Sequence, residues 1–113
     1  MEELILRVEN WALDKGILDV ATPMAQAIKT VEESAELAQA VSINDRDEII
    51  DAIGDIIVTI IIQAKMQGLS VQDCLESAYN VISQRTGRMI NGQFVKDQTK
   101  ICSCKLDLGQ CEC

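Results

Sequence analysis

Apolar residues recur every three or four positions along most of this chain, and this spacing restricts its fold more than any other feature. On a helix such spacing gathers side chains on one face, whereas a strand alternates them every second residue. It predicts four helices, at about residues 2–15, 23–42, 44–67 and 70–86. Only 3% of the residues are aromatic and one is proline, which favours an aliphatic helical protein over a sandwich or barrel. We therefore expect an all-α fold with a four-helix protomer.

Residues typical of helix ends support these segments. Thr22 precedes a proline at the first helical position and is expected to cap the second helix. Asn44, followed three residues later by an aspartate, is the expected cap of the third, and Ser70 that of the fourth. Gly16 and Gly68 are expected to end the first and third helices, because glycine readily adopts the left-handed conformation found there.

The run Ile56–Ile62 leaves two interpretations open. Its residues are all β-branched, which is also typical of a buried strand. The length of the segment and its end residues favour a helix. The run is far shorter than the roughly 20 apolar residues that span a bilayer, and Asp51 and Asp55 precede it, so we expect no membrane helix.

The C-terminal part of the chain is expected to be less regular. An Asn91-Gly92 turn between short apolar pairs predicts a small hairpin. Residues 98–113 show little periodicity and hold four of the five cysteines, so we divide the chain into a helical domain, 1–97, and a cysteine-rich tail, 98–113. The tail's Cys-x-Cys pairs do not have the spacing of common zinc knuckles, and in a cytosolic protein we expect free thiols or a dispensable extension.

Charge and composition exclude several functions. The formal net charge of -8 argues against general nucleic-acid binding, which needs Lys and Arg to neutralise phosphates. The chain has no histidine, which excludes triads built on histidine and di-iron sites built on Glu-x-x-His. No secretory signal is recognisable, so we expect a cytoplasmic location.

Two acidic clusters are set into the apolar pattern. The second predicted helix and the third carry three acids each: Glu32, Glu33 and Glu36, then Glu48, Asp51 and Asp55. Antiparallel helices would bring both clusters together, and like charges in one place need a cation. Carboxylates without histidine or cysteine select a hard divalent ion, Mg²⁺ first and Mn²⁺ as a substitute. The alternative is a solvated acidic face, but apolar neighbours place Asp51 and Asp55 beside buried surface.

Two motifs in these clusters resemble those of a known enzyme family. The segment Lys29–Ala38 is similar to the EExxE signature of MazG-like nucleoside triphosphate pyrophosphohydrolases, and Asp51–Asp55 resembles their ExxD motif. A third stretch, Cys74–Lys96, is similar to the end of small, phage-type members. The resemblance covers roughly residues 1–97. It implies an all-α fold and Mg²⁺-dependent hydrolysis of nucleoside triphosphates to monophosphate and pyrophosphate, with nucleotide-pool house-cleaning as the usual role.

Carried over by position, the resemblance assigns metal binding to Glu33, Glu36 and Asp55. Ala52 stands where the second motif of the family begins with glutamate, so Glu48 or Asp51 is expected to supply that oxygen. A spare carboxylate, Glu32 or Glu33, is the candidate catalytic base that takes a proton from the attacking water.

Substrate contacts are expected from cationic, amide and aromatic side chains. Four occupy positions that contact phosphates in the family: Lys29, Asn80, Arg85 and Arg88. Lys29 has the alternative of pairing with Glu33 one turn later, and the arginines suit a helix C-terminus. Trp11 is expected to pack in the core, because a large aromatic at helical spacing is ordinarily buried, and stacking on a nucleobase is its alternative role.

A second copy of the chain is the expected macromolecular partner. The third predicted helix is apolar on nearly every side, more than three short neighbours can cover. The resemblance implies a homodimer or homotetramer. Two alternatives to the assigned activity stay open: a non-catalytic helical binding protein, and the related phosphoribosyl-ATP pyrophosphohydrolase.

Overall fold

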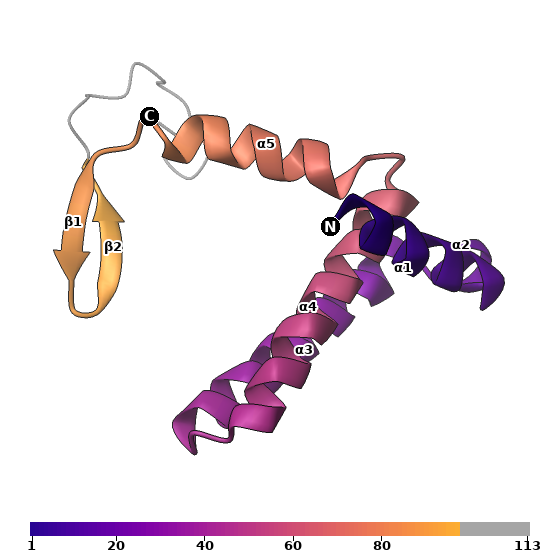
Figure 1. Ribbon diagram of the computed structural model, residues 1–113, viewed down its shortest axis with the longest axis horizontal. Helices are drawn as coiled ribbons and strands as arrows, with labels where there is room; N and C mark the ends of the chain where they lie inside the picture. Colours follow the sequence, from indigo (N-terminus) through magenta and orange to yellow (C-terminus); the bar gives the residue numbers. More distant parts are fainter. Residues whose placement is uncertain (98–113) are drawn as a thin grey trace. The chain divides into compact units, whose positions relative to one another are not determined.

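The computed structural model describes residues 1–97, which form helices followed by a small hairpin (Figure 1). Within these residues the elements are α1 Glu2–Asp14, α2 Ile17–Val20, α3 Pro23–Ser42, α4 Arg46–Met66, α5 Val71–Ile82, β1 Gly87–Ile90 and β2 Gln93–Lys96. The predicted helical class is confirmed, and the short α2 is an addition that the apolar pattern did not predict. The chain divides into two units, Met1–Glu76 and one that begins at Ser77. The predicted tail, 98–113, lies outside the described residues.

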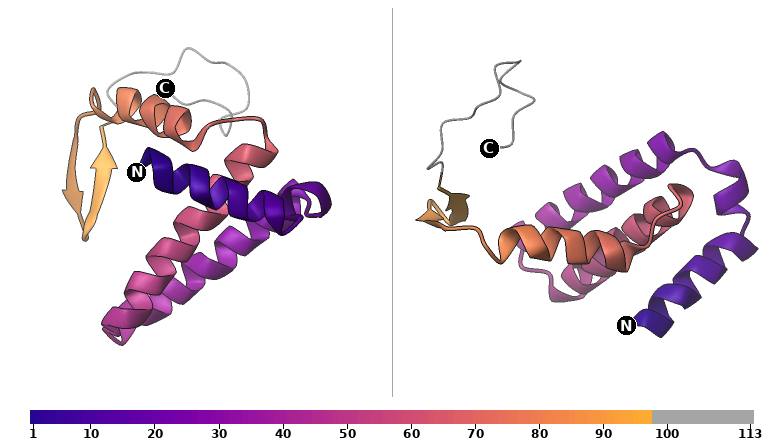
Figure 2. Two further views of the ribbon diagram at one scale, coloured as in Figure 1. Left: turned by 45° about the vertical axis from the view of Figure 1, so that its right-hand side comes forward. Right: turned by 90° about the horizontal axis from the view of Figure 1, so that it is seen from above.

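Helices α3 and α4 form an antiparallel pair that lies side by side in every view (Figures 1 and 2). Thr22 caps α3 as predicted, because its Oγ1 accepts a hydrogen bond from the backbone N–H of Ala25 at 3.1 Å. The predicted cap of α4 is wrong by one residue. Asp45, not Asn44, accepts a hydrogen bond from the backbone N–H of Glu48 at 3.2 Å. Asn44 has a φ of 55°, a left-handed conformation that Asn tolerates better than most residues and that reverses the chain between the helices.

The β-branched run of the sequence is helical, since Ile56–Ile62 lies inside α4. Helix α1 packs against α4, and α2 also contacts it. The apolar core of the described residues is small and consists of Ala12, Ala40, Ala52, Ile61, Ile62 and Ala64. Burial of alanine removes little apolar area from water, so this core stabilises the first unit less than one built from larger side chains. No helix within residues 1–97 is long and apolar enough to cross a membrane.

Helix α5 begins where the sequence predicts, because the Oγ of Ser70 accepts a hydrogen bond from the backbone N–H of Asp73 at 3.4 Å. In the second unit, β1 and β2 pair antiparallel, with Arg88 opposite Val95. Asn91 and Gly92 have φ values of 51° and 78°, the two positive angles that a type I′ hairpin turn requires. The predicted hairpin is confirmed.

Candidate functional site

Helix α3 carries the first acidic cluster on adjacent turns. Glu33 is buried, with 8% of its surface exposed, and Glu36 one turn later is exposed. Lys29 lies one turn before Glu33 and brings its Nζ to 3.5 Å from the Glu33 Oε1. Glu32 is exposed and projects about 100° away from Glu33 around the helix. The helix therefore pairs Glu33 with Glu36 and sets Glu32 aside.

Helix α4 places Asp55 opposite this pair. Asp55, Glu33, Lys29 and Trp11 line one open pocket of about 470 Å³. The aspartate comes from α4, the glutamate and lysine from α3 and the tryptophan from α1, so three helices build the pocket. Two predicted metal ligands and two predicted substrate contacts thus share one cavity.

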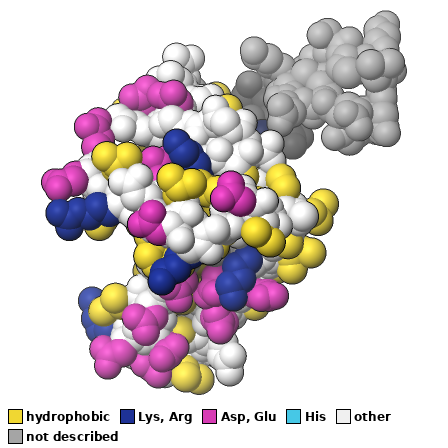
Figure 3. Space-filling model, turned by 90° about the vertical axis from the view of Figure 1, so that its right-hand side faces the viewer, with side chains coloured by type: hydrophobic (Ala, Val, Ile, Leu, Met, Phe, Trp, Pro, Cys, Tyr) yellow, Lys and Arg dark blue, Asp and Glu magenta, His cyan; other side chains and the backbone are white. Residues whose placement is uncertain are grey.

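The remaining carboxylates of α4 lie nearer the α3–α4 turn. Glu48 and Glu36 line a smaller pocket of about 240 Å³. Asp51 is exposed one turn from Glu48, on the same face of α4. Ala52 is buried, and these two acids are the carboxylates of α4 closest in sequence before it. Acidic side chains gather in the lower part of the space-filling view, toward the α3–α4 turn (Figure 3).

The neighbouring carboxylates change the pKa of Glu36. Hydrogen bonding with the Glu33 carboxyl, which requires a proton on one of the two groups, is the main reason why the pKa of Glu36 is raised above its usual value. The negative charge of Glu33, partial desolvation and the charge of Asp55 raise this pKa further, while Lys29 lowers it. Three acids from two helices therefore share one electrostatic environment.

A divalent cation suits this donor set. The one ion pair that these acids make within residues 1–97 is the contact of Glu33 with Lys29, so their repulsion is only partly compensated. Their oxygens match the preference of hard ions. The described residues gather no group of three or more Asp, Glu or Cys side chains that could hold a metal ion as they stand. The chemistry of the donors fits a cation with Glu33 and Glu36 as the first ligands, and the complete ligand set stays a prediction.

The predicted phosphate contacts fall in both units. Lys29 belongs to the carboxylate pocket, and its side chain is more than half exposed. Asn80 lies near the C-terminal end of α5, Arg85 follows the helix, and Arg88 lies on β1, all in the second unit. Their contact with phosphate stays a prediction.

A polar network between α3 and α4 escaped the sequence analysis. Gln26 is buried, and its Nε2 donates a hydrogen bond to the backbone carbonyl oxygen of Thr59 at 3.3 Å. The Thr30 hydroxyl donates to the Thr59 Oγ1 at 2.9 Å, and that hydroxyl donates to the Ile56 carbonyl oxygen at 2.7 Å. The spacing was a usable indication, because Gln26, Thr30 and Glu33 follow one another at four and three residues on one face.

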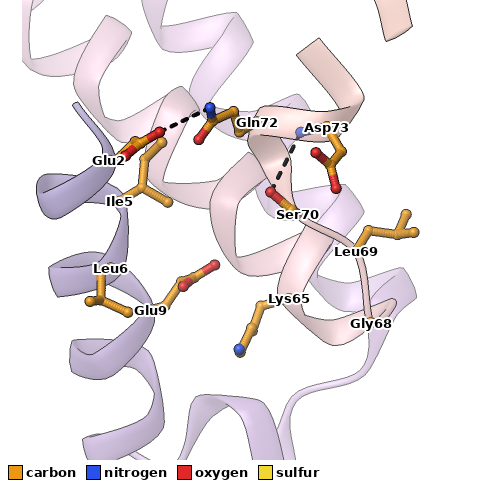
Figure 4. Close-up of a pocket in the computed structure, with 10 residues that line it drawn as sticks. All are labelled: Glu2, Ile5, Leu6, Glu9, Lys65, Gly68, Leu69, Ser70, Gln72 and Asp73. Carbon is orange, nitrogen blue, oxygen red and sulfur yellow. Dashed lines mark hydrogen bonds between the residues drawn. The ribbon is translucent and has the colours of Figure 1, made fainter. Parts of the chain in front are cut away.

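A larger pocket, of about 620 Å³, lies between α1 and the α4–α5 connection (Figure 4). Its polar groups bond to one another, as when Gln72 Nε2 donates to the Glu2 carboxylate at 3.1 Å. Lys65 and Glu9 also line it, without an ion pair within the described part of the chain. None of the predicted site residues lines this pocket, so its greater volume does not make it the functional site.

Comparison with known proteins matches the segment that carries these carboxylates to a protein family. The pattern of the MazG nucleotide pyrophosphohydrolase domain matches residues 22–89, which include every predicted carboxylate. A protein of Haemophilus phage HP1 (strain HP1c1), named as an uncharacterized 18.2 kDa protein in the rep-hol intergenic region, is 42% identical over 65 residues. That match takes in 58% of this chain and 40% of the relative, so the chain spans less than half of the relative's length. No solved structure matches. Because the domain match covers more than half of the chain, this protein belongs to the MazG nucleotide pyrophosphohydrolase family.

Proposed function

We propose that this chain hydrolyses nucleoside triphosphates, deoxynucleotides in particular, to monophosphate and pyrophosphate with the help of Mg²⁺. The observation that carries the proposal is the shared environment of Glu33, Glu36 and Asp55 inside a MazG domain. Such an activity suits the removal of unwanted nucleotides from the cytoplasmic pool.

Four carboxylates, drawn from five candidates, are the proposed holders of the cation: Glu33, Glu36 and Asp55, with Glu48 or Asp51 in place of the acid absent at Ala52. Mg²⁺, or Mn²⁺ in its place, supplies charge neutralisation of the triphosphate and lowers the pKa of water. Without it, the acidic pocket repels a polyanionic substrate.

The chain's own side chains bind and orient the substrate. Lys29 reaches the pocket from α3 and can donate a charge-assisted hydrogen bond to a phosphate oxygen. Asn80, Arg85 and Arg88 are proposed to donate to phosphate oxygens. Glu32 or Glu33 is proposed to accept the proton of the attacking water, a role that a carboxylate fills when it lies within hydrogen-bonding reach of that water.

The test is pyrophosphate release from each common ribo- and deoxynucleoside triphosphate in the presence of Mg²⁺. We expect release by the wild type and a loss of at least about a hundredfold in Glu36→Gln, since one charged ligand disappears. Glu3→Gln is the matched control, because Glu3 is an exposed acid on α1 paired only with Arg7. No release from any nucleotide above the level of Glu36→Gln contradicts the proposal.

The same assay separates the related activity. Phosphoribosyl-ATP is included as a substrate, and products are identified by chromatography. If phosphoribosyl-ATP is turned over faster than every nucleoside triphosphate, the protein is a phosphoribosyl-ATP pyrophosphohydrolase and the proposed substrate class is wrong. Cation binding without turnover of any of these compounds identifies a non-catalytic binding protein.

We further propose that the active form is a homodimer or homotetramer. On α4, four isoleucines spaced at three or four residues stay exposed: Ile50, Ile53, Ile57 and Ile60. They form one stripe, because positions three and four apart share a helix face. An apolar stripe of this kind on the central helix supports a second copy as its cover.

A further inference from the structure

The pocket that contains Glu33 and Asp55 extends beyond the carboxylates. Its volume of about 470 Å³ lies within the range of about 300–1,000 Å³ that small-molecule sites occupy. Ile17, Val58 and Ile62 give it an apolar lining. A ligand whose charged end is held at the carboxylates therefore has an apolar cavity beside it for its other end.

One polar side chain in this lining has an unused acceptor. Gln26 lines the pocket and is 92% buried, as only 8% of its surface is exposed. Its Nε2 donates to the Thr59 carbonyl oxygen, which fixes the orientation of the amide because a carbonyl oxygen only accepts. The Gln26 Oε1 has no hydrogen-bond partner among residues 1–97. No buried polar side-chain atom in that range lacks a partner, so the Gln26 Oε1, which has none, keeps contact with solvent.

The neighbours of Gln26 hold it in this position. The Thr59 hydroxyl is engaged with the Ile56 carbonyl oxygen and with Thr30, so it does not compete for the amide. Thr30 Oγ1 also lies 3.3 Å from the backbone carbonyl oxygen of Gln26. A buried amide fixed by its own donor presents its acceptor without reorganisation when a ligand arrives.

An aromatic ring lies in the same wall. Trp11 on α1 lines the pocket and is 49% exposed, so about half of its surface stays accessible and is not buried in the core. Flat heteroaromatic rings stack on such a surface, and each common nucleobase offers both a π-face and an N–H donor at its edge. The pocket thus combines a stacking surface, an apolar lining and one fixed acceptor.

We propose that this pocket takes the nucleobase, and that the Gln26 Oε1 accepts a hydrogen bond from a base N–H and thereby determines base preference. The proposal rests on the proposed function, since it places the triphosphate at Glu33 and Asp55. Gln26 is then a specificity-determining residue.

The test uses deoxynucleosides, which carry no phosphate and need no cation. Trp11 is the only tryptophan and reports stacking by fluorescence quenching. We expect saturable quenching by at least one of the four deoxynucleosides, and an affinity about three- to tenfold lower in Gln26→Leu, the loss of one hydrogen bond. No saturable quenching by any of the four at millimolar concentration overturns the proposal.

Gln63→Leu is the matched control. Gln63 also joins α3 to α4, because its Nε2 donates to the Pro23 carbonyl oxygen at 2.9 Å, but it lines a different pocket. We expect nucleoside affinity in Gln63→Leu to equal that of the wild type. An equal loss of affinity in both variants shows a structural role for Gln26 and overturns the proposal.

Wild-type protein gives a second readout that does not depend on whether a variant folds. For the base that binds, its analogue lacking the N–H is titrated as well: purine 2′-deoxyriboside against deoxyadenosine, 2-pyrimidinone 2′-deoxyriboside against deoxycytidine, 1-methyl-2′-deoxyinosine against deoxyguanosine or N3-methylthymidine against thymidine. The analogue is expected to bind about three- to tenfold more weakly, and equal binding overturns the proposal. Pyrophosphate release without nucleoside binding rejects the base pocket alone, whereas nucleoside binding without release rejects the proposed hydrolysis alone.

Discussion

At the scale of single residues, Glu36 gives a prediction about pH. The Glu33 hydrogen bond and charge raise the pKa of Glu36, so the folded chain binds this proton more tightly than the unfolded chain. The stability from this proton is complete below the ordinary value of 4.5 and is lost as pH rises through the folded pKa. Without divalent cations, we expect Glu36→Gln to unfold at a higher temperature than the wild type at neutral pH, with the gap closing below that value.

Thermal unfolding followed by circular dichroism in a chelator measures this difference. Glu3→Gln is the control, because its exposed pair with Arg7 is worth little. A neutral-pH midpoint for Glu36→Gln at or below that of the wild type contradicts the repulsion that we infer among Glu33, Glu36 and Asp55.

The same residue predicts the effect of metal. A cation that binds only the folded state raises the free energy of unfolding. This increase grows with the logarithm of the ratio of the cation concentration to its dissociation constant. Mg²⁺ should therefore raise the unfolding midpoint of the wild type. It should raise that of Glu36→Gln less, because the variant has a neutral amide in place of one charged carboxylate ligand. An equal rise in both proteins places the cation elsewhere.

At the scale of elements, the sequence predicted the four longer helices and the hairpin. Helix periodicity placed α1, α3, α4 and α5, and the Asn91-Gly92 pair predicted the hairpin, because these depend on neighbours within a few residues. The short α2 was missed, since four residues are too few to show a period. The Gln26 network was missed for another reason: the partner of its amide is a backbone carbonyl 33 residues away.

The corrected cap of α4 can be tested directly. Asp45→Ala removes the acceptor for the Glu48 N–H, and we expect a loss of about 1 kcal/mol in the free energy of unfolding. Asn44→Gly should be neutral or slightly stabilising, because Asn44 has a φ of 55° that glycine adopts without strain. Urea unfolding of both variants measures these free energies. A larger loss of unfolding free energy in Asn44→Gly than in Asp45→Ala would identify Asn44 as the cap.

At the scale of the whole molecule, the described residues, 1–97, leave much apolar surface uncovered. Their core is mostly alanine, while the stripe Ile50, Ile53, Ile57 and Ile60 faces outward on α4. If the same stripe of a second copy covers it, apolar area of both chains is removed from water. Each Å² of apolar area buried in this way contributes roughly 25 cal/mol to the free energy of association. The association that we propose would therefore add stability to a small aliphatic domain.

A charge on the stripe should dissociate the oligomer. We expect the wild type to sediment as a dimer or tetramer at micromolar concentration and Ile57→Asp to sediment as a smaller species with a lower unfolding midpoint, because the interface would bury an unpaired carboxylate. Leu4→Asp is the control, since Leu4 is an exposed apolar residue of α1 and does not belong to the stripe. Dissociation by Leu4→Asp and not by Ile57→Asp moves the interface to α1, and a fully folded wild-type monomer leaves the α4 stripe without the role that we assign to it.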